Sequence, residues 1–235
     1  MSTLPARPSE ISRKSAPPPD FDRLAGPYRW LEYLTFGNWL ARTRCAFLPR
    51  LAQCRNALVL GDGDGRFTAR LLCANPTVRV LAIDASPAML RSLVRLAGVH
   101  AARVSTQVAD ARLWRPEQSA SWDQPCDAIC THFFLDCLTT AEIQAMAETV
   151  RPSLSPAAIW VVSEFAVPPG WFGDCVARPL VWVLYRVFGA LTGLTVRTLP
   201  DHESALQAAG FTLLERQTRL AGLLVSEIWS TARGV

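Results

Sequence analysis

The sequence predicts an α/β fold: a doubly wound, seven-stranded sheet that is mostly parallel and ends in a C-terminal antiparallel hairpin. Two patterns carry this prediction. From residue 57 to residue 165, short apolar runs alternate with segments of helical periodicity, which is typical of parallel strands joined by crossover helices. The last two apolar runs are separated by a turn around Gly222, which indicates a hairpin. Half of the 235 residues are hydrophobic, so the chain can bury a large core.

The composition narrows the class of protein. The net charge of +4 is concentrated in the first 50 residues, so we expect no nucleic-acid partner. The cysteines form no C-x-x-C pair and the histidines lack zinc-ligand spacing, so we predict no metal site. We expect a cytoplasmic protein for three reasons. The cysteines are scattered, the polar N-terminus is unlike a signal peptide, and the chain has no stretch of 18 uncharged apolar residues that could span a membrane. No obligate protein partner is evident.

The N-terminal region divides into two parts. Residues 1–20 are rich in proline, serine and arginine and predict a disordered tail, whereas residues 21–235 predict a single domain. Within that domain, large apolar residues recur at helical spacing over residues 21–50, and Pro27 and Gly37 break them into short lid helices. Two interpretations are open for these helices: packing onto the main domain, or a lid over a pocket.

The remaining elements follow in order along the chain. The expected strands are 57–60, 78–83, 103–108, 128–131, 157–162, 211–218 and 223–230. The expected helices are 66–74, 86–96, 140–151 and 202–209. Ser86 and Pro87 suit the N-cap and first position of the second helix, and we expect Thr140 to cap the third. Gly210 ends the last helix, and the polar residues 113–125 predict a surface loop.

Residues 171–195 form an apolar insertion between the fifth strand and the last helix. Charged residues, Pro179 and Gly189 interrupt its core, residues 171–194, too often for a transmembrane helix. Three interpretations stay open: a buried helix, a wall of an apolar substrate pocket, or an element that makes peripheral contact with a membrane surface.

Three alternating glycines, Gly61, Gly63 and Gly65, follow the first strand. Glycine takes positive φ without steric cost and lets the backbone come close to a ligand, and the helix that follows offers unpaired N–H groups at its N-terminus. Alone, this loop is equally compatible with a plain connection between a strand and a helix.

Two acidic residues favour the ligand-binding interpretation. Asp84 ends the second strand and Asp110 follows the third, so both lie on the rim of the sheet where ligands bind in parallel folds. The first is placed to accept the hydroxyls of a ribose, and the second to accept an adenine amino group. Because Arg66 occupies a position where a dinucleotide fold needs a small residue, and no phosphate-binding lysine follows, the loop suits S-adenosylmethionine better than a nicotinamide or flavin cofactor.

Three segments resemble the first three motifs of class I S-adenosylmethionine-dependent methyltransferases: Val-Leu-Gly-Asp-Gly-Asp-Gly-Arg-Phe, Ala-Ile-Asp-Ala-Ser-Pro-Ala-Met-Leu and Val-Ala-Asp-Ala. The resemblance spans about residues 57–165 and implies a Rossmann-like fold. Residues 21–28 and the tail around Ala209-Gly210-Phe211 are similar to the ubiquinone/menaquinone biosynthesis C-methyltransferase branch.

The resemblance implies a cofactor site and a role for most of its members. The glycines contact the methionine tail through their backbone, Asp84 the ribose, Met89 the adenine ring and Asp110 the adenine amino group. Ala111 offers a backbone N–H, Tyr28 closes over the methionine end, and Thr131 and His132 face the reacting methyl group. The implied cofactor-binding residues are Tyr28, Gly61, Asp62, Gly63, Gly65, Asp84, Ala85, Met89, Asp110, Ala111 and Thr131.

Two positions depart from the family pattern. The family usually carries an acid two residues before the first glycine, where this chain has Val59, and Asp62 is the nearest acid that could take over part of its role. The quinone branch tends to have an Arg-Asn pair after the fourth strand, where this chain has Asp136 and Cys137.

Methyl transfer is an in-line displacement that gains most from alignment and desolvation, and it needs a base only when the nucleophile must lose a proton. His132 is the candidate base, with a hydrogen-bonded structural histidine as the alternative. Asp136 is either a substrate ligand or part of the next helix.

The sequence therefore predicts a methyltransferase that acts on a small, apolar or aromatic, quinone-like molecule. The alternative is a non-catalytic relative that binds a nucleoside or serves as an interaction module.

Overall fold

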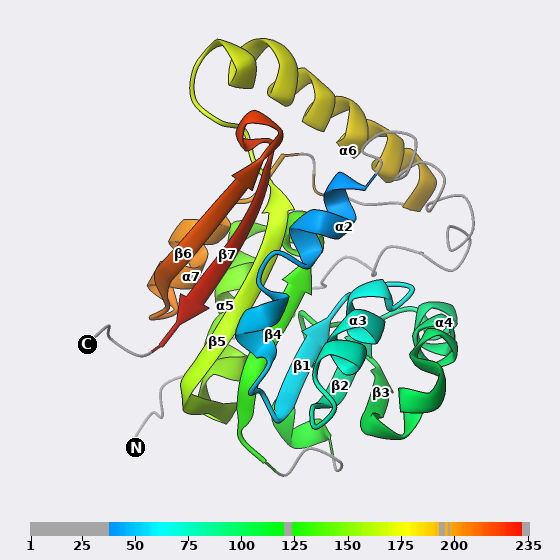
Figure 1. Ribbon diagram of the computed structural model, residues 1–235. Coiled ribbons are helices and arrows are strands. Elements are labelled where there is room, and N and C mark those ends of the chain that lie inside the picture. The colour runs from blue at the N-terminus through cyan, green and yellow to red at the C-terminus, as the bar shows by residue number, and fades with distance from the viewer. Residues whose placement is uncertain (1–37, 120–123, 193–195, 197, 232–235) are drawn as a thin grey trace, which may run out of the picture.

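The computed structural model describes residues 38–119, 124–192, 196 and 198–231. Its seven strands form one sheet in the order β3-β2-β1-β4-β5-β7-β6 (Figure 1). The neighbours from β3 to β5 pair in parallel, and β7 pairs antiparallel with both β5 and β6. The predicted fold class, with its C-terminal antiparallel hairpin, is confirmed. The strands are β1 (Asn56–Leu60), β2 (Arg79–Asp84), β3 (Val104–Val108), β4 (Cys126–His132), β5 (Leu154–Phe165), β6 (Thr212–Arg219) and β7 (Leu224–Ser230).

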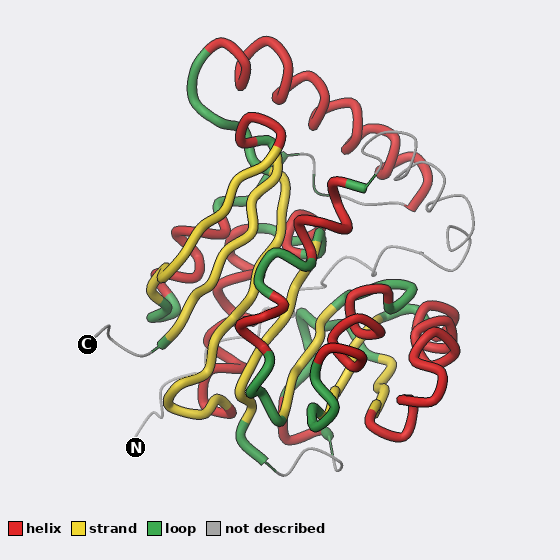
Figure 2. The backbone as a smooth tube through the Cα atoms, viewed as in Figure 1, coloured by secondary structure: helices red, strands yellow, loops and turns green. Residues whose placement is uncertain are grey.

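Helices cover both faces of this sheet, as Figure 2 shows. The α-helices are α2 (Trp39–Arg44), α3 (Arg66–Ala74), α4 (Pro87–Ala97), α5 (Thr140–Val150), α6 (Arg178–Thr192) and α7 (His202–Ala208). A π-helical turn over Gly173–Ala177 leads into α6. Ser86 caps α4, since its hydroxyl accepts the N–H of Met89 at 3.1 Å, as the sequence predicts.

The N-cap of α5 corrects one prediction. Thr139, not Thr140, caps this helix, because the Thr139 hydroxyl accepts the N–H of Glu142 while the Glu142 carboxylate accepts the N–H of Thr139 at 2.8 Å. This reciprocal arrangement requires an acid or amide three residues after the cap. Thr140 has Ile143 at that position, so it cannot form the same box.

β5 is longer than the expected strand 157–162. It pairs with β4 as far as Ser163 and with β7 as far as Phe165, since a strand held between two neighbours can continue through polar residues. The extension brings Glu164 to the carboxyl end of the sheet as part of the strand.

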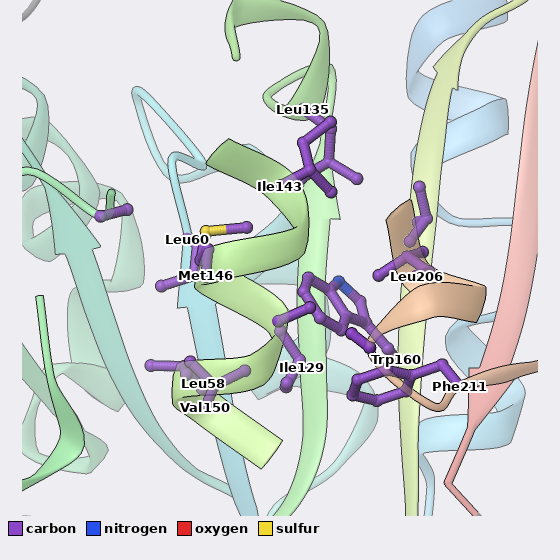
Figure 3. Close-up of a cluster of buried hydrophobic side chains, with 14 of the residues drawn as sticks. Leu58, Leu60, Ile129, Leu135, Ile143, Met146, Val150, Trp160, Leu206 and Phe211 are labelled. Carbon is purple, nitrogen blue, oxygen red and sulfur yellow. The ribbon is translucent and has the colours of Figure 1, made fainter. Parts of the chain in front are cut away.

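Two buried clusters lie on opposite faces of the sheet. Along β1, Leu58 and Leu60 belong to one cluster and Ala57 and Val59 to the other, as the alternation of side chains in a strand requires. α5 and α7 cover the first face, and α3 and α4 cover the second. Figure 3 shows the first cluster, in which the Trp160 ring meets another aromatic ring edge to face at 5.3 Å.

α2 and α6 lie at the carboxyl ends of β4 and β5 (Figure 1). The buried side of α6, with Val181 and Tyr185, packs with Leu40 of α2 and Leu224 of β7. The opposite side exposes Trp182 and other apolar residues, so the predicted insertion is buried on one side only. Among the described helices, none is long and apolar enough to cross a membrane.

Part of the N-terminal predictions lies outside the described residues, namely the tail 1–20, the first lid residues and Tyr28. Within residues 38–50, Phe47 is buried in the cluster beneath α3. This part of the predicted lid segment therefore packs onto the main domain.

Candidate functional site

The glycine loop joins β1 to α3 at the carboxyl rim. Gly61, Gly63 and Gly65 all have positive φ, at 65°, 61° and 85°. A Cβ on Gly61 would lie 2.1 Å from the Phe134 ring, whereas a Cβ on Gly63 would meet none of the described residues within 4 Å. The fold itself therefore requires a glycine at 61, while at 63 the backbone leaves space for a ligand to approach closely.

Asp62 supports this loop from within. Its Oδ2 accepts the backbone N–H of Thr68 at 2.9 Å and the Thr68 hydroxyl at 2.7 Å, which satisfies an open donor in the first turn of α3. Burial raises the pKa of Asp62, and the bonds from Thr68 and the charge of Arg44 oppose that rise. Val59 lies in the core against α3, so Asp62 is the acid that shapes the loop.

Asp84 lies directly beside the glycine loop. The Gly61 N–H donates to the carbonyl of Ile83 at 2.9 Å, which joins the loop to the end of β2. Oδ1 of Asp84 accepts the N–H of Ser86 at 2.8 Å, and Ala85 lies between them. The buried Met89 follows in the first turn of α4. The structure thus brings the predicted ribose acid next to the predicted methionine cradle.

Asp110 is held in an ion pair that the sequence did not reveal. Both of its carboxylate oxygens lie 3.0 Å from Nε of Arg112, and Nη2 of the same arginine lies 2.6 Å from Oδ2. Arg112 also reaches Glu142 of α5 at 3.2 Å. Burial favours the neutral acid, but the bonds from Arg112 prevail and lower the pKa of Asp110. A contact with an adenine amino group would share these oxygens with Arg112. The neighbouring Ala111 is buried.

Thr131 and His132 end β4 and are both buried. Oγ1 of Thr131 accepts the indole N–H of Trp160 at 2.9 Å. The His132 ring packs on Phe67 with centroids 4.1 Å apart, and its Nδ1 lies 3.0 Å from the Ser163 hydroxyl. Burial, with the charge of Arg44, lowers the pKa of His132 to about 3. Such an imidazole is neutral and weakly basic at physiological pH, which favours the structural histidine over the candidate base.

Glu164 belongs to the site although sequence reasoning missed it. Its Oε1 accepts the backbone N–H groups of Phe134 and Leu135 at 3.1 and 2.8 Å. Because Phe134 packs against Gly61, Glu164 fixes the loop after β4 against the glycine loop. The signal was present, since an acid ending a buried strand is the same pattern that identified Asp84.

Asp136 and Tyr185 complete this end of the rim. The Tyr185 hydroxyl, on the buried side of α6, donates to the carbonyl of Asp136 at 2.8 Å. Burial is the main cause that raises the pKa of Asp136 to about 6. Across the described residues, no group of three or more His, Cys, Asp or Glu side chains could hold a metal ion.

Comparisons with known proteins bear on the fold and on the class of domain. Residues 58–159 match the family model described as "Methyltransferase domain". The trans-aconitate 2-methyltransferase of Methylobacterium radiotolerans is 35% identical over 89 residues, which cover 37% of this chain and 33% of that enzyme. The chain therefore spans about a third of the length of this curated relative.

Solved structures share the fold at low identity. The mitomycin 7-O-methyltransferase MmcR superposes with a TM-score of 0.66 at 15% identity, covering 90% of this chain and 60% of that chain. A DhpI–SAH complex superposes with a TM-score of 0.61 at 18% identity, covering 90% of this chain and 93% of that chain. None of these three proteins is described as a ubiquinone or menaquinone enzyme, so that branch stays a prediction. Residues 58–159 are therefore similar to methyltransferase domains, and the seven-stranded sheet shares the fold of these solved methyltransferase structures.

Proposed function

We propose that this protein transfers the methyl group of S-adenosylmethionine to a small apolar or aromatic molecule. The observation that carries the proposal is the glycine loop, which is open at Gly63 and joined to the end of β2 directly before Asp84. A backbone without side chains beside a carboxylate suits the methionine end and the ribose of one nucleoside. The relatives described as methyltransferases support the same chemistry.

The residues present fit this cofactor. Gly63 leaves room for the methionine end, and the Asp84 carboxylate lies beside it for the ribose hydroxyls. Met89, Asp110 and Ala111 follow toward the adenine end. When bound, S-adenosylmethionine supplies a methyl group on a positively charged sulfur. The chain contributes alignment and exclusion of water, which suffice for an in-line displacement.

The acceptor end is mainly apolar. Phe133, Phe165 and Leu184 pack with the buried side of α6 at the end of the strands. These side chains support an apolar or aromatic acceptor, and a quinone-like molecule is one member of that class. Among the described side chains, those around His132 offer no strong base, so the acceptor most compatible with this site enters already as a reactive nucleophile.

The Arg112–Asp110 ion pair favours a second candidate function. Because Arg112 engages both oxygens of Asp110, the adenine contact is weaker than in a site with an unpaired acid, which favours a non-catalytic nucleoside-binding module. Calorimetric binding of S-adenosylmethionine, with no methylated product across a broad acceptor panel, would select this candidate.

Asp84→Ala tests the proposed site. We expect its affinity for S-adenosylmethionine to fall by about 10- to 100-fold, because hydrogen bonds to a carboxylate contribute roughly 1.5–3 kcal/mol. Isothermal titration calorimetry measures this change. Glu148→Ala, on the exposed side of α5, is the matched control and should bind as the wild type does. Equal affinities of Asp84→Ala and the wild type would contradict the site.

A further inference from the structure

Two carboxyl groups, those of Glu164 and Asp136, lie near enough to interact electrostatically at the carboxyl rim, on the side where we propose that the acceptor binds. Glu164 ends β5, and Asp136 lies in the short 3₁₀ turn Leu135–Cys137 after β4. The two groups interact electrostatically, and both also act on the Tyr185 hydroxyl from α6. Three elements thus place two acids and a phenol beside the predicted position of the acceptor.

One atom of this group lacks a partner. Glu164 is only 2% exposed. Its Oε1 accepts the Phe134 and Leu135 N–H groups, whereas its buried Oε2 accepts no hydrogen bond from any described residue. The Tyr185 hydroxyl already donates to the Asp136 carbonyl. A buried acceptor without a donor destabilises a fold, so native proteins rarely keep one without a use for it.

Among the residues that the structure describes, no cation compensates the two carboxyls. The groups that act on the two carboxyls, within the described residues, are each other and backbone N–H groups, together with the Cys137 thiol on Asp136. Cys137 and Tyr185 are neutral, because burial raises the pKa of both, and the nearby Asp84 adds a further acid. Asp136, whose pKa is about 6, is mostly charged at pH 7.5 and would repel an anion placed here. A hydrogen-bond donor would instead replace the proton that Glu164 holds and satisfy Oε2.

We propose that Glu164 Oε2 and the Asp136 carboxyl recognise the acceptor through an ammonium or hydroxyl donor and reject a carboxylate of the same shape. The inference rests on the proposed function, since it assigns the substrate class of that same site. The apolar side chains around α6 hold the body of the molecule, and the acid pair selects its polar group.

Three probes of one shape test the proposal: benzylamine, benzyl alcohol and benzoate, titrated at pH 7.5 into the protein saturated with S-adenosylhomocysteine. Ligand-observed NMR gives the apparent Kd of each probe. We expect benzylamine and benzyl alcohol to bind at least tenfold more tightly than benzoate. Benzoate binding equal to or tighter than that of benzylamine overturns the proposal, and so does binding of none of the probes. Failure of S-adenosylhomocysteine itself to bind would instead contradict the proposed function.

Glu164→Gln assigns the selectivity to the acid pair. The amide keeps an oxygen for the Phe134 and Leu135 N–H groups but replaces Oε2 by a donor, so the preference for benzylamine over benzoate should fall at least tenfold. Glu148→Gln makes the same change on the outer side of α5 and should keep the preference. Should Glu164→Gln unfold, Asp136→Asn provides the same comparison, because the Asp136 carboxylate bonds only within its own turn. Unchanged selectivity in the folded variant contradicts the proposal.

Discussion

At the residue scale, the glycines of the β1–α3 loop differ in what surrounds them. Gly61 and Gly65 are enclosed by Phe134 and Leu93, whereas Gly63 has open space on its Cβ side. A substitution at Gly61 or Gly65 disrupts packing. Of the three glycines, only Gly63 can be substituted to test ligand binding without disturbing the packing of the fold.

Gly63→Ala should therefore weaken S-adenosylmethionine binding about tenfold while the protein stays folded. The added methyl group enters the space left for the ligand, and positive φ adds about 1–2 kcal/mol of strain. Gly98→Ala is a stricter comparison, since Gly98 also has positive φ and open space and its ψ of −123° makes an alanine more strained there, but Gly98 follows α4 away from the rim. Calorimetry and thermal melting compare the two variants. Equal loss of affinity in both would mean that strain alone explains the effect.

Glu164 gives a pH signature of its own. Burial, with the nearby Asp136 charge, raises the pKa of Glu164 well above its usual value, so the folded protein holds this proton more tightly than the unfolded chain does. The corresponding stability is complete below about pH 4.3 and is lost as the pH rises through the folded pKa. Glu164→Gln should hence show a flatter Tm between pH 5 and pH 8 than the wild type or Glu148→Gln. Parallel curves for all three proteins would contradict the raised pKa.

The site residues could be predicted where topology alone decides their position. Asp84 follows from the rule that parallel strands end on one rim. Successive side chains in a strand point to opposite faces of the sheet, so Thr131 and His132 of β4 face opposite sides. The sequence alone therefore argues against the prediction that both side chains face the reacting methyl group. The Arg112–Asp110 pair could not be predicted, because several arginines lie nearby in sequence and the loop conformation selects one.

At the element scale, the buried carboxylate of Glu227 connects the C-terminal hairpin to α7 through hydrogen bonds. Glu227 of β7 accepts hydrogen bonds from His202 at 3.0 Å, Trp229 at 2.8 Å and Arg216 at 2.8 Å. Burial disfavours its charge, but His202, Trp229 and Arg216 together lower the pKa of Glu227. The ionised carboxylate is therefore part of what holds β6, β7 and α7 together.

Glu227→Gln should destabilise the fold by about 1–3 kcal/mol at pH 7, since the amide leaves charged and polar donors poorly paired. A lowered pKa gives stability above the unfolded value of about 4.3 and loses it as the pH falls through the folded pKa. The difference from the wild type should shrink at pH 3.5, as measured by chemical denaturation. Glu215→Gln, an exposed acid on β6 paired with Arg50, is the control, and a difference independent of pH would contradict the prediction.

The boundaries of helices could be predicted where the hydrophobic periodicity and the capping residues indicate the same start. The helices 66–74 and 86–96 match α3 and α4 to within one residue, because glycine and Ser-Pro mark their starts. β5 was predicted too short, since polar residues in a strand paired on both sides resemble a loop in sequence. Thr139 and Thr140 are distinguished only by what lies three residues further on.

At the scale of the whole molecule, the outer side of α6 and the turn before it expose more large aromatic side chains than is usual for a folded protein. Trp171 is 74% exposed and Trp182 is 56% exposed, and the guanidinium of Arg186 lies 4.9 Å from the Trp182 ring centre. Aromatic and basic residues on one helix side are typical of elements that lie at a lipid interface. Peripheral membrane contact through residues 171–194 stays a prediction, and this surface supports it.

Liposome sedimentation tests that contact. The wild type should co-sediment with vesicles of phosphatidylglycerol and phosphatidylcholine, and binding should fall as salt rises. The variant Trp171→Ser/Trp182→Ser should lose most of the bound fraction, because the apolar contact is removed while both side chains lie outside the core. Trp39→Ser removes another partly exposed tryptophan, from α2, as a control. If the wild type fails to co-sediment with the vesicles at low salt, the membrane interpretation is wrong.

The position of β7 between β5 and β6 has a consequence for synthesis on the ribosome. β7, the last of the described strands in sequence, completes the sheet, so β5 keeps an unpaired edge until residues 224–230 have emerged. Open strand edges pair readily with other chains, and contacts between distant segments form slowly. A nascent chain of this protein is therefore most prone to aggregate before β7 has emerged, and a stop codon ahead of β7 would leave a product with that edge permanently exposed.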